Sequence, residues 1–301
     1  MSRPVRRGRL SPGEMFPAGD PAYRVSYPRL RSGIKVRVVE TGSSAAPPVL
    51  FVPGWGCPVY VFRRNLRVVA NAGFRAIAVD LKGHGLSFKP VGAAEYSLES
   101  LVDHLEEILN ALELDKPALV GHSMGATLLY HFVSRHPERA RSLALLSPVG
   151  LSGVPLMWLY RSLTPSFLKP LIRRVRPRTV VKVALMRVYG RRGRFTEEDV
   201  DQYWAQTQFP ESSLALTQLL HSYDWSAART RKLSTVRLPA LGMWGSRDHL
   251  IPPEGLALYE RLIPGIVLRE IEGAGHIIPE ETPEEVNDAV IALLRGYIPS
   301  K

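Results

Sequence analysis

The chain is poor in cysteine and contains no long apolar run. Its 301 residues include one cysteine, Cys57, so an internal disulfide cannot form and a reducing compartment is allowed. The arginines near the N-terminus are followed by Ser11-Pro12-Gly13 and not by an apolar stretch, which argues against a secretory signal. No apolar run approaches the length of a bilayer-spanning helix. We therefore expect a cytoplasmic protein.

Clusters of metal ligands and nucleic-acid-binding motifs are also missing, so we expect no metal, no cofactor and no nucleic-acid partner. The charge is nevertheless uneven: the net charge is +11, and residues 151–238 carry 15 Lys or Arg against 6 Asp or Glu. A solvated, arginine-rich face is the simplest interpretation. Peripheral contact of this basic segment with an anionic membrane is the alternative that we keep. The oligomeric state stays open.

The apolar residues fall into short runs separated by helical patterns. Continuous runs predict strands that are buried on both faces, and apolar residues at helical spacing predict the helices between them. This alternation predicts an α/β fold with a mostly parallel central sheet and helices on both faces. The predicted strands cover residues 23–27, 34–40, 49–52, 76–79, 118–120, 143–146, 240–244 and 266–271, and the predicted helices include 61–71, 98–112, 253–262 and 283–297.

The alternation is interrupted once. Residues 151–235 show helical patterns punctuated by proline and no strand–helix alternation, so we interpret them as an inserted α-helical cap over the strand ends. The core then consists of residues 23–150 and 236–301. Residues 1–22, which are rich in Arg, Pro and Gly, are predicted to be a mobile basic tail. The aromatic residues of the cap are expected to line a substrate cavity.

One short stretch carries the strongest chemical signal, Gly121-His122-Ser123-Met124-Gly125. A buried strand precedes it and an amphipathic helix follows it, so Ser123 is predicted at the apex of a tight strand–turn–helix unit. Side chains at Gly121 and Gly125 would collide with neighbouring backbone. The pattern alone is short enough to occur by chance, and its context makes it a candidate nucleophile.

A serine nucleophile needs a base and a group that orients the base. His276 follows the last predicted strand in a Gly-x-Gly-His loop and is the candidate base. Asp248 follows the preceding predicted strand and is the candidate orienting acid, in competition with Asp224 and Glu272. Serine, acid and histidine in this chain order suit a triad at the carboxyl ends of parallel strands.

Acyl transfer also needs donors for the oxyanion of the tetrahedral intermediate. The backbone N–H of Met124 and that of Trp55, in the loop after the strand 49–52, are the candidates. His122 is expected to point away from the site and His84 to brace its own loop. We interpret Cys57 as a small apolar residue because no activating partner is evident.

Together these segments resemble the α/β-hydrolase superfamily with a helical cap. The resemblance lies in Pro53-Gly54-Trp55-Gly56, in residues 80–87 and 121–125, and in Gly245-Ser246-Arg247-Asp248 and Gly273-Ala274-Gly275-His276. It spans nearly the whole chain apart from the tail and the cap. One departure is Pro53, since the family commonly has a histidine at that point of the oxyanion loop. Epoxide hydrolases and haloalkane dehalogenases resemble this fold but use an aspartate in place of the serine.

The resulting hypothesis is a serine hydrolase that cleaves a carboxylic ester, with a lipophilic acyl or alcohol part, through an acyl-enzyme on Ser123. Fold does not determine the reaction. The same triad is compatible with carbon–carbon bond hydrolysis, lactone opening or acyl transfer. A third hypothesis is a ligand-binding member of the fold that keeps the triad without measurable turnover.

Overall fold

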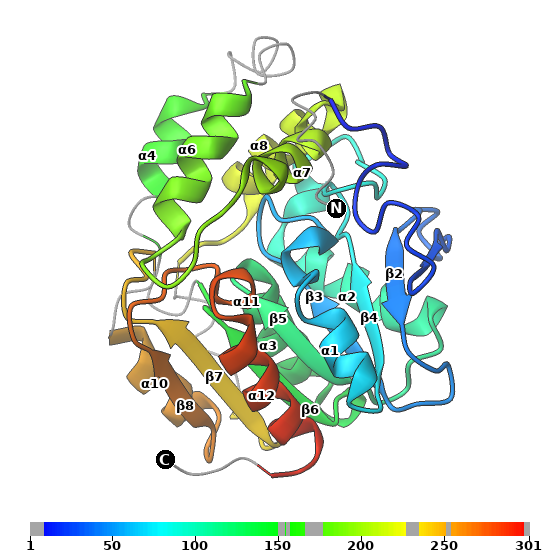
Figure 1. The fold of residues 1–301 in the computed structure, drawn as a ribbon, viewed down its shortest axis with the longest axis vertical. Coiled ribbons are helices and arrows are strands. Elements are labelled where there is room, and N and C mark those ends of the chain that lie inside the picture. Colours follow the sequence, from blue (N-terminus) through cyan, green and yellow to red (C-terminus); the bar gives the residue numbers. More distant parts are fainter. Residues whose placement is uncertain are drawn as a thin grey trace, which may run out of the picture.

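The protein is built around one eight-stranded sheet (Figure 1). A computed structural model describes residues 9–149, 154, 157–165, 177–226, 235–250 and 254–297. The order in the sheet is β1-β2-β4-β3-β5-β6-β7-β8; β2 pairs antiparallel with β1 and β4, and the remaining pairs are parallel. The strands are β1 (Arg24–Ser26), β2 (Val38–Thr41), β3 (Pro48–Val52), β4 (Arg75–Val79), β5 (Ala118–His122), β6 (Ser142–Leu146), β7 (Ala240–Gly245) and β8 (Val267–Ile271).

Helices cover both faces of the sheet because alternate residues of the central strands are buried on opposite sides. Leu50 and Val52 of β3 belong to a cluster with α2 (Leu98–Ala111), α3 (Met124–Arg135) and α10 (Glu254–Leu262). Val49 and Phe51 belong to a second cluster with α1 (Leu66–Asn71) and α12 (Pro283–Leu294). The mostly parallel sheet with helices on both faces, predicted from the sequence, is therefore confirmed.

The helix predicted over residues 61–71 is divided in the structure. A 3₁₀ turn covers Val59–Phe62, and α1 begins only at Leu66. The Asp80 carboxylate accepts the N–H of Val59 at 2.7 Å, which fixes the start of the turn to the loop after β4. The long helix α2 begins at the predicted residue, Leu98. Ser97 caps it, and the Ser97 side chain accepts the N–H of Ser100.

A helical insertion lies between β6 and β7. Its described helices are α4 (Met157–Leu163), α6 (Arg178–Val188), α7 (Glu197–Thr207) and α8 (Pro210–Ser222). Thr196 and Asp199 form a reciprocal capping box at the start of α7. Residues 166–176 and 227–234 of the predicted cap lie outside the described residues.

The segment before β1 packs against the core. Residues 1–8 lie outside the described residues, but Met15 is buried and the Phe16 ring contacts Tyr23 and Tyr60 edge-on. The Gln202 side chain of α7 accepts the N–H of Phe16 at 3.0 Å. Residues 15 and 16 of the expected mobile tail thus contact both the core and the insertion. Within the described residues, no helix is long and apolar enough to span a bilayer.

Candidate active site

Ser123 occupies the turn between β5 and α3. Its φ of 55° and ψ of −122° lie in a backbone region that residues other than glycine rarely adopt. The turn is possible because its neighbours are glycines: a Cβ on Gly121 would lie 2.5 Å from Ala126 Cα, and one on Gly125 would lie 2.3 Å from the Val52 carbonyl oxygen. The serine side chain is thereby held at the edge where the parallel strands end, as the sequence predicts.

The structure brings together the three side chains expected to form a triad. Ser123 Oγ lies 2.8 Å from His276 Nε2, and His276 Nδ1 lies 2.7 Å from Asp248 Oδ2. The Asp248 side chain is 1% exposed and that of His276 is 6% exposed, so water screens neither contact strongly. With Nδ1–H donating to the carboxylate, Nε2 accepts the serine hydroxyl.

Two neighbouring loops place Asp248 beside the histidine. The N–H of Ser246 donates to the Ile271 carbonyl at 3.0 Å, and that of Arg247 donates to the Ala274 carbonyl at 2.8 Å. These bonds join the loop after β7 to the loop after β8. The competing acids lie elsewhere: Asp224 accepts the N–H of Ser226, and Glu272 is exposed.

The candidate oxyanion loop lies directly against the nucleophile. A Cβ on Gly54 would be 2.7 Å from Ser123 Cβ and 3.2 Å from Ser123 Oγ, which shows how closely the two segments approach. Trp55, the next residue, is fixed by its indole N–H, which donates to the Leu216 carbonyl of α8 at 3.0 Å. Among the described residues, the backbone N–H groups of Trp55 and Met124 have no hydrogen-bond acceptor.

Comparison with known proteins decides the family. The family model described as alpha/beta hydrolase fold matches residues 47–283. The chain belongs to the α/β-hydrolase family. The chain is 27% identical, over 88% of its length and 96% of the relative, to the AB hydrolase superfamily protein YfhM of Bacillus subtilis.

Two further matches carry names that describe an activity. The chain is 30% identical to a 2-hydroxy-6-oxo-2,4-heptadienoate hydrolase of Pseudomonas putida, over 89% of this chain and 94% of that protein. The crystal structure of epoxide hydrolase A from Mycobacterium thermoresistibile superposes with a TM-score of 0.72 at 23% identity, covering 92% of this chain and 99% of that one. The structural match supports the fold, and the family supports a hydrolase.

His122, which was expected to point away from the site of this α/β hydrolase, lies beside the histidine instead. Its Nε2–H donates to the His276 backbone carbonyl at 3.0 Å, and the two rings are 5.2 Å apart. Burial and the neighbouring His276 lower the pKa of His122 to about 3, so the ring is neutral at physiological pH. His122 therefore braces the loop that carries the base.

Glu281 is a second bracing residue, and the sequence analysis missed it. Its carboxylate accepts the N–H of Gly275 at 2.7 Å and those of Gly190, Arg192 and Gly193 at 3.0 to 3.2 Å. Two backbone bonds add to this contact: the N–H of His276 donates to the Val188 carbonyl at 2.7 Å, and that of Arg191 to the Gly273 carbonyl at 2.8 Å. Residues 188–193 of the insertion are thus clamped to the histidine loop. We call this contact the Glu281 clamp.

The other singled-out side chains keep structural roles. His84 is fully buried, its Nδ1 faces the Lys82 carbonyl, and burial lowers its pKa to about 4. Burial raises the pKa of Cys57 to about 12, so the thiol stays protonated and is a poor nucleophile. His221 is exposed and faces the Thr164 carbonyl instead of the serine. No group of three or more His, Cys, Asp or Glu in the described ranges could hold a metal ion.

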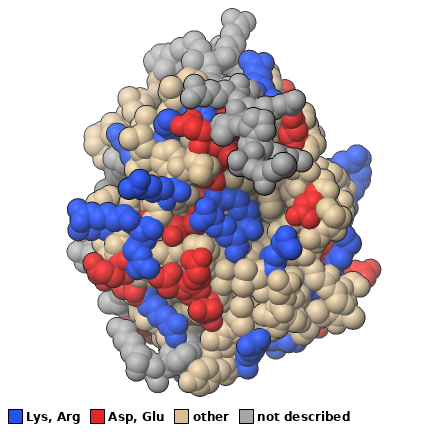
Figure 2. All heavy atoms as spheres, in the orientation of Figure 1, with Lys and Arg blue, Asp and Glu red and all other residues tan. Residues whose placement is uncertain are grey.

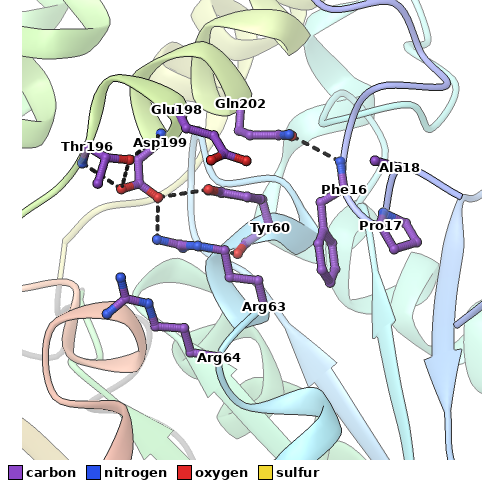
Figure 3. Close-up of a pocket in the computed structure, with 10 residues that line it drawn as sticks. All are labelled: Phe16, Pro17, Ala18, Tyr60, Arg63, Arg64, Thr196, Glu198, Asp199 and Gln202. Atoms are coloured by element: carbon purple, nitrogen blue, oxygen red, sulfur yellow. Dashed lines mark hydrogen bonds and ion pairs between the residues drawn. The ribbon is translucent and has the colours of Figure 1, made fainter. Parts of the chain in front are cut away.

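A cavity of about 380 Å³ lies where the N-terminal segment, the 59–62 turn and α7 meet (Figure 3). Arg63 projects along it and pairs with Asp199, which also accepts the Tyr60 hydroxyl at 2.8 Å. Arg63 pairs in addition with the fully buried Glu280 at 2.7 Å. No triad residue lines this cavity. Since its buried charges already have partners, we regard it as a joint between core and insertion.

Proposed function

We propose that this hydrolase cleaves carboxylic esters through an acyl-enzyme on Ser123, with Asp248 and His276 as the other catalytic residues. The observation that carries the proposal is the continuous hydrogen-bonded path from Ser123 through His276 to the buried Asp248. A serine hydroxyl is a weak nucleophile at neutral pH, and a paired imidazole removes its proton as the new bond forms. The single cysteine is compatible with a reducing cytoplasm, where we expect the reaction to take place.

The residues have distinct tasks in such a reaction. His276 Nε2 takes the serine proton while Oγ attacks the ester carbonyl, and then returns the proton to the leaving alcohol. Asp248 holds the imidazole in the tautomer that exposes Nε2 and stabilises its protonated form. The N–H groups of Trp55 and Met124 would stabilise the oxyanion. A water activated by His276 then hydrolyses the acyl-enzyme.

The helical insertion favours a lipophilic substrate if it acts as a cap. Met124, directly after the nucleophile, packs in a cluster with Leu219 of α8 and with Trp225. Trp55 extends this cluster, and its ring meets the Trp225 ring edge-on at 6.1 Å. An acyl chain that approaches Ser123 from the insertion side would therefore meet apolar side chains.

Carbon–carbon bond hydrolysis is the second candidate. It is supported by the 30% identity to the 2-hydroxy-6-oxo-2,4-heptadienoate hydrolase, which extends over nearly the whole of that protein. The epoxide-hydrolase structure gives less support to epoxide opening, because enzymes of that class resemble this fold but use an aspartate where this chain has Ser123. Lactone opening and acyl transfer use the same triad, and fold alone does not separate them.

The proposal is tested with Ser123→Ala on p-nitrophenyl esters of increasing acyl length. We expect a loss of at least about 10⁴-fold in kcat/KM, because no other group replaces the nucleophile. Ser134→Ala, at the far end of the same helix, is the matched control and should retain wild-type activity. Near wild-type turnover by Ser123→Ala would reject the acyl-enzyme mechanism.

The substrate class is tested with a panel of esters, lactones and 6-oxo-dienoates, with products identified by mass. Turnover of a dienoate at a much higher kcat/KM than that of any ester would favour carbon–carbon bond hydrolysis. Labelling of Ser123 by a fluorophosphonate without turnover of any panel member would instead favour a ligand-binding protein.

A further inference from the structure

Two helices of the insertion expose large apolar side chains to solvent. Both helices, α4 and α6, are drawn at the upper edge of Figure 1, beyond the ends of the strands. Single exposed apolar residues are ordinary on protein surfaces, whereas a concentration of them on two short helices calls for an explanation. The exposed fractions are 68% for Trp158 and 62% for Leu163 on α4, and 62%, 50% and 62% for Val180, Val183 and Met186 on α6.

Helix α6 is apolar on two opposite faces. Val181, Leu185 and Val188 follow helical spacing and pack against the core cluster that includes α12. Val180, Val183 and Met186 lie on the other side and face solvent. Packing among the described residues accounts for the first face and leaves the second exposed to solvent.

The same stretch of chain is unusually basic. From residue 151 to residue 196 there are 11 lysines and arginines and no aspartate or glutamate. In Figure 2, Lys and Arg form a band where the insertion meets the core, and acidic residues gather below it over the core. The area above that band, where Figure 1 places α4 and α6, is mainly neutral in this view.

Some of these cations already have partners. Arg178 and Lys182 pair with Glu197 at 2.7 and 2.5 Å. The exposed side chains of Arg187, Arg191 and Arg194 make no hydrogen bond or ion pair with another described residue. These three guanidinium groups are therefore available to an external anion.

We propose that the outer face of α4 and α6 docks the protein on an anionic phospholipid bilayer. Exposed Trp, Leu, Val and Met side chains lose unfavourable contact with water when they enter the boundary between headgroups and acyl chains. Arg187 on α6, and Arg191 and Arg194 in the segment that follows α6, supply the attraction to phosphate groups in the headgroups. The inference is independent of which bond the active site cleaves.

A nucleic acid would satisfy the charge but not the apolar side chains. Contacts to a phosphate backbone are polar and ionic, so Val180, Val183 and Met186 would gain nothing from them. A bilayer surface offers both anionic phosphates and hydrocarbon, and this combination favours the membrane.

The test is co-sedimentation of the full chain with vesicles of phosphatidylcholine alone and of phosphatidylcholine mixed with phosphatidylglycerol. We expect selective binding to the anionic vesicles, weakening several-fold as salt rises from about 0.1 to about 0.5 M. Arg187→Gln combined with Arg191→Gln should weaken binding by about fivefold per charge removed. Val183→Ser combined with Met186→Ser should weaken it by about tenfold or more.

Matched controls separate docking from loss of fold. Val91→Ser removes a side chain that is 82% exposed elsewhere on the surface, and Arg295→Gln removes an exposed charge at the end of α12. Both should bind vesicles like the wild type, and all variants should retain the wild-type melting temperature. Equal binding to neutral and anionic vesicles, or wild-type binding by the α6 variants, would overturn the proposal. Retardation of duplex DNA without any vesicle binding would also overturn it.

Discussion

At the scale of single residues, the active site depends on how closely backbone segments approach Ser123. Gly54 has an ordinary φ, so conformational freedom does not explain the glycine there. Lack of space explains the glycine, because a Cβ at position 54 would lie 2.7 Å from Ser123 Cβ. A contact of that length forces one of the two segments to move.

Gly54→Ala is therefore expected to lower kcat by about 10²-fold or more, because a displacement of the nucleophile by a fraction of an ångström removes its alignment with the base. Gly56→Ala is the control in the same loop, since a Cβ there meets nothing within 4 Å although its φ of +74° adds strain. Steady-state kinetics and melting temperatures of both variants make the comparison. Equal losses of kcat in the two would assign the effect to loop strain and not to contact with Ser123.

Residues differ in how readily sequence reasoning finds them. Ser123, Asp248 and His276 are each predictable because each follows a recognisable strand within a glycine-containing loop. Glu281 and His122 act through backbone atoms, and Gly190, which Glu281 holds, is 91 residues away in the chain. No local pattern encodes a contact of that kind. The one available signal was a pair of acids, Glu280 and Glu281, directly after the apolar residues 277–279.

At the scale of elements, the Glu281 clamp connects the insertion to the loop that carries the base. One carboxylate accepts four backbone N–H groups, and hydrogen bonds to a buried charged acceptor are among the stronger ones. The strands and most helices were predictable from apolar spacing, and the helical character of the insertion was too. The attachment of the insertion to the core was not predictable, because hydrogen bonds to backbone atoms make that attachment.

Glu281→Gln should place an amide NH₂ among groups that are themselves donors. We expect about a tenfold to hundredfold fall in kcat, with a smaller change in KM, because His276 loses its alignment. The free energy of unfolding should fall by about 2 kcal/mol or more. Glu284→Gln, an exposed acid in the first turn of α12, is the control. If fluorophosphonate labelling of Ser123 proceeds at the wild-type rate in Glu281→Gln, the clamp does not position the base.

At the scale of the whole molecule, buried neutral histidines make stability depend on pH. Burial lowers the pKa of His84 to about 4 and those of His104 and His122 to about 3. Below a pH of about 6.5 the unfolded chain binds protons at these rings that the native protein does not bind. The stability that these three histidines contribute is therefore fully present above pH 6.5 and is lost as pH falls from 6.5 toward their native pKa values of about 4 and 3.

Each of these rings should contribute up to about 1.4 kcal/mol of lost stability per pH unit in that window. Denaturant unfolding at pH 7.5, 6, 5 and 4.5 measures the slope. His104→Gln, which keeps an acceptor for the Lys82 N–H, should make the slope shallower by about one proton. An unfolding free energy that stays constant between pH 6.5 and 4.5 would show that these histidines titrate normally.

The attachment of residues 188–193 also has a consequence for protein engineering. By sequence alone the inserted segment ends where the next strand begins, yet this short piece of it is bonded to the loop of the catalytic base. A chimera that receives foreign helices from a related enzyme should leave those six residues with the recipient. The junctions of the chimera should lie before residue 188 and after residue 193. Otherwise the chimera loses the hydrogen bonds that hold the His276 imidazole in place.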